Sequence, residues 1–176
     1  MSCPDFSPEQ KDRLLQYAER SRKRNQELGM TLSGEPQRPR IDQVCFGKEC
    51  SIHIPRSAET WGTFHTHGDG RAKLGCFDTY ATVWHGHSHA CVGGVEHGKP
   101  VVRCYAVEPS MRGDAVRRVR AMNAEQQKSP RMNGEFFNQR YQLGCDIKDS
   151  SVREVCQVRK EKRTAPRQTT LKARKS

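Results

Sequence analysis

A close succession of strand-like segments between residues 41 and 107 constrains the fold of this chain more than any other feature. These segments are rich in β-branched residues or alternate between apolar and polar residues, and several are bounded by Gly or Pro. Between the third and fourth of them, apolar residues recur at three- and four-residue steps from Phe77 to Trp84, which predicts a helix over 76–85. The sequence therefore predicts an α+β fold, a mixed β-sheet flanked by helices. The strands are expected at 41–46, 51–54, 60–67, 89–95 and 101–107.

The first forty residues predict one helix and one short strand. Ser7 is placed to cap the helix, Pro8 suits its first position, and Gln10 completes a capping box. The helix is amphipathic and is expected to end before Gly29. A short strand and a proline-containing loop should follow, at 30–34 and 35–40.

The last third of the sequence predicts less regular structure. A helix is expected to begin at Pro109, with Ala115 and Val119 on its apolar face. Beyond Gln127 we expect an irregular stretch with an aromatic cluster of Phe136, Phe137 and Tyr141. The final twenty residues carry eight basic side chains and one acidic side chain, which is typical of a disordered tail. The expected division is a domain, a helical or irregular extension and a basic C-terminal tail, at 7–108, 109–156 and 157–176.

The positive charge of the chain is concentrated at its C-terminal end. The formal net charge is +11, and a basic chain favours an acidic partner. Residues 1–40 carry 8 basic and 6 acidic side chains, residues 41–108 carry 6 and 7, and residues 109–176 carry 17 and 7. The strand-rich part is therefore nearly neutral, and the charge indicates a partner for the last third.

The chain has eight cysteines, whose redox state depends on the cellular compartment of the protein. No apolar window approaches the roughly 18 to 20 residues that a membrane helix needs. The first residues also lack the charged and then apolar pattern of an export signal. These features predict a cytoplasmic protein outside the membrane, with its cysteines as small buried thiols. No compact four-ligand pattern of cysteines predicts a zinc finger.

The most informative residues for function are His65 and His67, followed by Asp78. Residues two apart on a strand point to the same face, about 6.5 Å from one another, so both imidazoles can converge on one ion. Asp78 lies near the start of the predicted helix, where the chain has doubled back over the strand end. Two neutral histidines and one carboxylate with an open fourth position form the layout of a hydrolytic zinc site.

At this point the sequence resembles the JAMM (MPN-type) zinc metalloproteases, which cleave isopeptide or peptide bonds after ubiquitin and ubiquitin-like proteins. Their signature is His-x-His-Pro, five residues, Pro-Ser, two residues and Asp. Here His65, His67 and Asp78 have this spacing, and the segment 27–34 resembles the family's Glu-containing segment. The resemblance covers about residues 10 to 108 and implies a JAMM-like fold, related to the architecture of cytidine deaminases.

The resemblance also implies roles for individual residues. His65, His67 and Asp78 would bind one Zn²⁺ ion, and Glu27 would be the general base for a metal-activated water. Glu35 and Glu49 are nearby alternatives to Glu27. The family's Ser, which donates a hydrogen bond to the oxyanion, is replaced by Gly75, and the family's Pro by Gly68. Loss of one oxyanion donor typically costs on the order of 10² to 10³ in turnover, so attenuated activity is expected.

Two function classes follow from these residues. The first is a zinc metallopeptidase or isopeptidase that acts on a ubiquitin-like conjugate or a peptide. The second is a catalytically weak JAMM-like scaffold that binds a partner or nucleic acid through its basic C-terminal region. Phosphate contacts in that region would come from Arg159, Lys160, Lys162 and Arg163. The sequence leaves the oligomeric state open.

A further run of alternate histidines lies just after the predicted helix. His85, His87 and His89 could form a second metal cluster, but only His87 and His89 are expected to share an extended face. A solvent-exposed loop is the preferred interpretation.

Overall fold

The computed structural model describes the chain except residues 1, 48–58, 68, 129–132 and 161–176. The predicted α+β class is confirmed, because a six-stranded mixed sheet is flanked by four helices in the described part of the chain. No helix in that part is both long enough and apolar enough to cross a membrane. The elements are α1 (Pro8–Arg24), β1 (Glu27–Glu35), β2 (Arg38–Gly47), β3 (Thr60–Thr66), α2 (Cys76–Trp84), β4 (His89–Glu96), β5 (Lys99–Val107), α3 (Pro109–Lys128), α4 (Asn133–Ser151) and β6 (Val152–Arg159).

The six strands are arranged in the order β2-β1-β3-β4-β5-β6. The β3 and β4 strands are parallel, and each of the other neighbouring pairs is antiparallel. A parallel pair needs a crossover connection, and here α2 lies in that connection. The start of α2 therefore follows soon after the end of β3.

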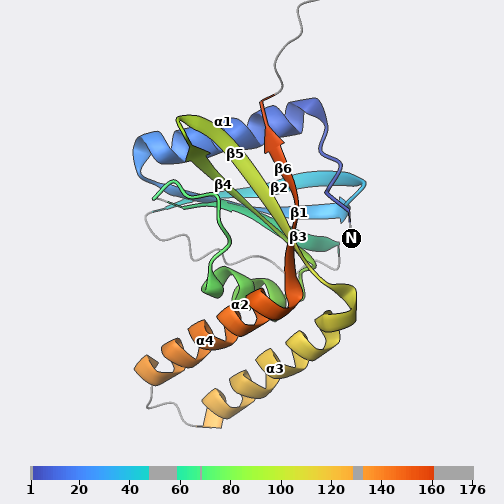
Figure 1. Cartoon of the computed structure of the whole chain (residues 1–176), viewed down its shortest axis with the longest axis vertical. Coiled ribbons are helices and arrows are strands. Elements are labelled where there is room, and N and C mark those ends of the chain that lie inside the picture. The colour runs from blue at the N-terminus through green and yellow to red at the C-terminus, as the bar shows by residue number, and fades with distance from the viewer. Residues whose placement is uncertain (1, 48–58, 68, 129–132, 161–176) are drawn as a thin grey trace, which may run out of the picture.

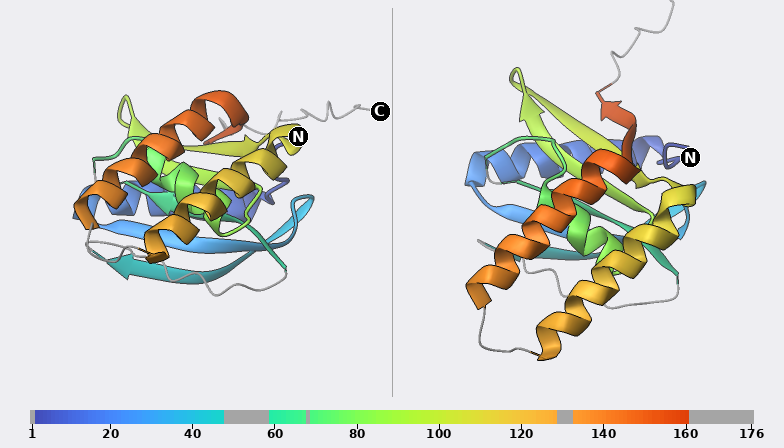
Figure 2. Two further views of the ribbon diagram at one scale, coloured as in Figure 1. Left: turned by 90° about the horizontal axis from the view of Figure 1, so that it is seen from below. Right: turned by 60° about the horizontal axis from the view of Figure 1, so that its bottom comes forward.

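Each face of the sheet has its own apolar core. One core contains Leu14 and Leu15 of α1, and the other contains residues of α2, α3 and α4. Along β4, Cys91 belongs to the first core, while Ala90 and Val92 belong to the second, as the period of two in a strand requires. The sheet accordingly separates α1 from the other three helices (Figure 1). Figure 2 shows α3 and α4 running side by side over the second face.

The predicted N-terminal helix begins as expected and ends at Arg24, before Gly29 as predicted. Ser7 caps α1, and the capping box with Gln10 is present. Asn25 adopts a left-handed conformation with φ 46° and terminates the helix, so Glu27 already lies on β1. The loop expected at 35–40 is shorter, because β2 begins at Arg38. Pro39 is tolerated within β2 because β2 is at the edge of the sheet.

The prediction of an irregular stretch after Gln127 is wrong for the described residues there. They form α4 and β6, and β6 pairs with β5 in the sheet. The expected boundary after residue 108 therefore does not separate a domain from an extension, and 157–159 belong to β6 rather than to a tail. The predicted helix at Pro109 and the strands at 60–67, 89–95 and 101–107 are confirmed within one or two residues. The strand expected at 51–54 lies outside the described residues.

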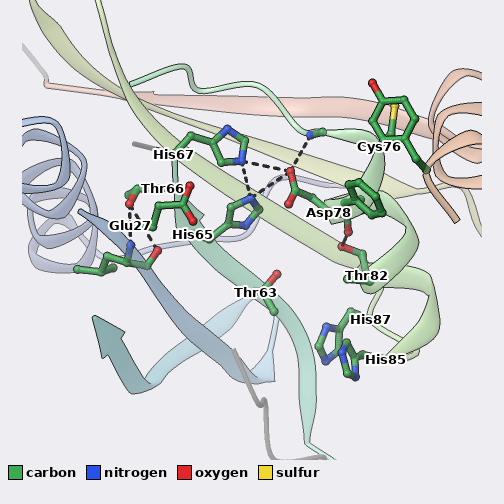
Figure 3. A pocket seen from close by; sticks show the side chains of 15 residues that line it. Glu27, Thr63, His65, Thr66, His67, Cys76, Asp78, Thr82, His85 and His87 are labelled. Carbon is green, nitrogen blue, oxygen red and sulfur yellow. Dashed lines mark hydrogen bonds and ion pairs between the residues drawn. The ribbon is translucent and has the colours of Figure 1, made fainter. Parts of the chain in front are cut away.

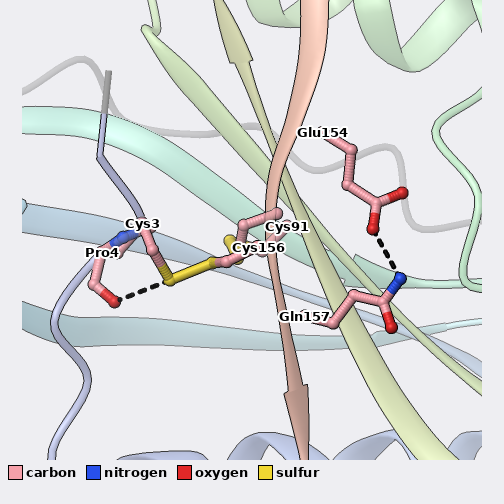
Figure 4. Close-up of a disulfide and its surroundings, with 7 residues drawn as sticks. Cys3, Pro4, Cys91, Glu154, Cys156 and Gln157 are labelled. Atoms are coloured by element: carbon pink, nitrogen blue, oxygen red, sulfur yellow. Dashed lines mark hydrogen bonds between the residues drawn. A yellow bond between two sulfur atoms is a disulfide. The ribbon is translucent and has the colours of Figure 1, made fainter.

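Six cysteines form disulfides, which contradicts the expectation of reduced thiols for them. The pairs are Cys3–Cys156, Cys76–Cys145 and Cys91–Cys104. Cys91 and Cys104 face each other directly across β4 and β5. The Cys3–Cys156 pair ties the N-terminal segment to β6, close to Cys91 (Figure 4). The Cys76–Cys145 pair joins the first residue of α2 to α4.

Candidate metal centre

The two histidines are positioned by the alternation of β3. Phe64 and Thr66 are buried and belong to the side of the sheet that faces α1. Thr66 donates to Ser21 of α1 at 2.7 Å and accepts a hydrogen bond from the Leu28 backbone N–H at 3.0 Å. His65 and His67 consequently point to the opposite face, where α2 lies.

The ligand atoms of His65, His67 and Asp78 form a triangle. The two Nε2 atoms are 3.1 Å apart, and Asp78 Oδ2 lies 3.4 Å from His65 Nε2 and 3.2 Å from His67 Nε2 (Figure 3). A tetrahedral zinc site with bonds of about 2.0–2.1 Å separates its ligand atoms by about 3.3–3.4 Å. The three residues therefore fit one face of a zinc tetrahedron. In the described part of the chain, no other group of three or more His, Cys, Asp or Glu residues could hold a metal ion.

Asp78 is held in place by the first turn of α2. The backbone N–H of Gly75 donates to Asp78 Oδ2 at 2.7 Å, and Thr82 Oγ1 donates to the Asp78 carbonyl at 2.6 Å. A Cβ atom at Gly75 would lie 2.7 Å from Asp78 Oδ2, which is too close. The glycine thus leaves room for the carboxylate in this position.

The charges of the three residues reinforce one another. Burial opposes ionisation of Asp78, but the charge of His65 and hydrogen bonds with both histidines outweigh it and hold the pKa of Asp78 well below its usual range. The hydrogen bond with Asp78 raises the pKa of His67, against the opposing effect of burial. The negative charge of Glu27 acts in the same direction on His67. The site therefore favours positive charge at the histidines, which a bound cation would provide.

Of the three candidate bases, the structure brings Glu27 to the site. Residue Gly29 of β1 pairs with His65 of β3, so the start of β1 lies beside the end of β3. Glu27 lines the same pocket as the three ligands, and Figure 3 shows its side chain directed toward the two histidines. Glu35 is exposed at the other end of β1, about 26 Å away along the strand. Glu49 lies outside the described residues.

These residues line one pocket of about 590 Å³. Its wall includes Phe77 from α2 and Tyr141 from α4, in addition to Thr63 on the same strand face as His65. Sequence analysis did not assign these three residues to the site. Thr63 could have been found from its two-residue spacing to His65, whereas Tyr141 depends on a helix that the sequence pattern did not predict.

No protein-family model and no curated protein matches this chain. The likeness to the JAMM metalloproteases therefore depends on the spacing of His65, His67 and Asp78 and on the segment that begins at Glu27. The structure shows that His65, His67, Asp78 and Glu27 line one pocket.

The alternate histidines after α2 are not a solvent-exposed loop. His87 and His89 are only 3% and 5% exposed, and His85 is half-buried. His85 and His87 stack with ring centroids 5.7 Å apart and line the same pocket, and Figure 3 shows them apart from the three ligands. His89 instead packs edge-on against Trp61. The three do not form a metal-binding group among the described residues.

The basic residues proposed to contact phosphate are only partly described. Arg159 is the last residue of β6, is exposed, and donates to Gln157 Oε1 at 2.8 Å. Lys160 is exposed directly after the strand. Lys162 and Arg163 lie outside the described residues.

Proposed function

We propose that this chain is a zinc-dependent metallopeptidase of JAMM-like fold that hydrolyses an isopeptide or peptide bond, with a ubiquitin-like conjugate as its substrate class. The observation that carries the proposal is the triangle of His65, His67 and Asp78 with the carboxylate of Glu27 in the same pocket. Such an arrangement combines a metal-binding carboxylate with a second carboxylate that can take part in proton transfer.

Different residues bind the metal and transfer the proton during hydrolysis. His65, His67 and Asp78 would hold the zinc ion, which would supply Lewis acidity toward a water molecule and the substrate carbonyl. Glu27 accepts a proton from the attacking water and delivers it to the nitrogen of the leaving amine as the C–N bond breaks. Asp78 would bind the metal as its carboxylate, so Glu27 rather than Asp78 is the base in this proposal.

The cleavage test uses the full chain loaded with one equivalent of zinc and a peptide or an isopeptide-linked fusion of a ubiquitin-like protein. We expect hydrolysis by the wild type and a loss of about 10² to 10⁴ in kcat for Glu27→Gln. Glu35→Gln is the matched control, since Glu35 is an exposed glutamate on the same strand. Unchanged turnover in Glu27→Gln, or no hydrolysis of either substrate by the wild type, contradicts the proposal.

The second candidate function is a weakly catalytic scaffold that binds nucleic acid or another acidic partner. It is favoured by the absence of a hydroxyl at Gly75 and by the exposed basic residues Arg159 and Lys160. A truncation after Lys160 leaves β6 complete and removes the remaining basic residues of the tail. In this candidate, truncation weakens binding to DNA or RNA and flattens its salt dependence.

The cytoplasmic location was predicted from the lack of an export signal and of a membrane helix, and it implied reduced thiols. Disulfides persist mainly in oxidising compartments, so the three pairs favour such a compartment instead. Alkylation of thiols before and after reduction, in protein trapped at acid pH, distinguishes reduced thiols from disulfides. Six additional alkylated cysteines after reduction support the oxidised form.

A further inference from the structure

Two of the most exposed large apolar side chains in the described part of the chain lie beside the metal centre. Phe137 is 59% exposed and Tyr141 is 47% exposed, and both are on α4. Their rings are 4.3 Å and 5.3 Å from the ring of Phe77, measured between centroids. We call Phe77, Phe137 and Tyr141 the aromatic shelf.

The aromatic shelf is continuous with the pocket that holds the three ligands. Phe77 directly precedes Asp78 on α2, and Phe77 and Tyr141 both line the pocket with His65, His67 and Asp78. Phe137 extends this surface outward by one turn of α4. A molecule bound at the metal centre therefore has an aromatic wall on one side.

The position of the shelf is fixed by the contact between α2 and α4. Phe137, Tyr141 and Cys145 are spaced by four residues and share one face of α4. Cys145 is bonded to Cys76, and the neighbouring Gly144 lets the helices approach so closely that a Cβ there would lie 2.0 Å from the Cys76 carbonyl oxygen. The shelf is thus held against the helix that carries Asp78.

The character of the lining indicates what the shelf binds. Of the described residues that line the pocket, none is Lys or Arg, and its two carboxylates are those of Glu27 and Asp78. The described lining therefore offers no Lys or Arg side chain to bind an anionic ligand. Its aromatic rings offer apolar contact instead. Apolar surface left exposed beside a pocket commonly marks a binding site.

We propose that the aromatic shelf binds a large apolar side chain, such as Leu, Met or Phe, that flanks the bond to be cleaved in the polypeptide substrate. This inference rests on the proposed function and adds the substrate preference of the same site. Phe137 and Tyr141 are specificity-determining residues in this account, because they contact the substrate beside the reacting atoms.

The test measures binding of two hydroxamates to the zinc-loaded full chain by calorimetry, so that it does not depend on turnover. Acetohydroxamic acid presents only the metal-binding group, and 3-phenylpropionohydroxamic acid adds an apolar side chain. We expect the second to bind at least about tenfold more tightly, as burial of about 60 Å² of apolar surface provides. Phe137→Ala combined with Tyr141→Ala should remove this gain and leave acetohydroxamate affinity and zinc content unchanged.

The matched control is Phe136→Ala, which removes the neighbouring aromatic ring of α4. Phe136 lines a different pocket, with Tyr80 and Arg140, so this variant should keep the full gain. Equal affinity of the two hydroxamates for the wild type overturns the shelf inference. The inference is also overturned if the double variant changes the oligomeric state but keeps the full gain in hydroxamate affinity. The shelf would then be an interface between copies of the chain. Failure to bind either zinc or acetohydroxamate instead contradicts the proposed function, and the inference falls with it.

Discussion

The Nε2 atoms of His65 and His67 lie 3.1 Å apart at the end of β3, and Asp78 Oδ2 is within 3.4 Å of both. Two imidazole nitrogens at this separation cannot both carry a proton without repelling each other. A shared proton or a cation between them relieves that repulsion, and the carboxylate compensates the added charge. This arrangement gives the proposed zinc site its physical basis.

Substitutions of Gly75 should have separate effects on zinc affinity and on kcat. A Cβ at this position meets Asp78 Oδ2 at 2.7 Å, so Gly75→Ala should displace the carboxylate and lower zinc affinity by about tenfold or more. Gly75→Ser adds the same Cβ and also a hydroxyl that can donate to an oxyanion. At saturating zinc, kcat of the Ser variant should exceed that of the Ala variant by about 10² to 10³. Equal kcat values would show that no donor is missing at this position.

The Cys76–Cys145 disulfide should support both stability and metal binding. It closes a loop with a sequence separation of 69, so Cys76→Ser with Cys145→Ser should lower the free energy of unfolding by about 2–4 kcal/mol. Because Cys76 is two residues before Asp78, zinc affinity should fall as well. Chemical denaturation and a zinc competition assay measure the two effects.

The control for this experiment is the pair Cys3→Ser with Cys156→Ser. This disulfide lies on the opposite face of the sheet from the metal centre, so its removal should reduce stability and leave zinc affinity unchanged. An equal loss of zinc affinity in both double variants would contradict a local role for Cys76–Cys145.

His89 should destabilise the folded protein as the pH falls below neutrality. Burial lowers the pKa of His89, so the unfolded chain takes up a proton that the folded chain does not. The loss therefore begins as the pH falls through the ordinary histidine pKa of about 6.5 and ends once the pH is below the lowered pKa of the folded state. Free energies of unfolding at pH 7.5 and 5.5 should differ less in His89→Asn than in the wild type.

His97→Asn serves as the control for the pH experiment. His97 is exposed in the turn between β4 and β5 and has φ 50°, a conformation that Asn accepts readily. This variant should keep the pH dependence of the wild type. If His89→Asn also keeps it, other groups are responsible for the acid sensitivity.

Much of the candidate site follows from local sequence patterns. The two-residue spacing of His65 and His67 on a strand places them on one face, and the crossover helix brings Asp78 over that face. Glu27 was assigned to the site through the family resemblance, while its position on a strand depends on α1 ending at Asn25. The strand was predicted only from Met30 onward, so the position of Glu27 on β1 was not predicted.

Local sequence patterns did not predict the α4 helix, the β6 strand or the disulfides. Among the apolar residues of α4, Leu143 and Ile147 are buried, and Gly144 and Cys145 provide a close contact with α2 that has no periodic signature. Disulfide pairing depends on the register of β4 and β5 and on the approach of α4, which are tertiary features. The part of the pocket wall formed by Tyr141 was missed for the same reason.

The zinc content of the purified full chain tests the central claim most directly. After dialysis against buffer with equimolar zinc and then against metal-free buffer, the wild type should retain close to one equivalent, measured by mass spectrometry of the metal. His67→Ala should retain almost none. Asp69→Asn, which changes an exposed carboxylate two residues from His67, should retain as much as the wild type. A wild type without zinc, or a His67→Ala variant with as much zinc as the wild type, would contradict the account.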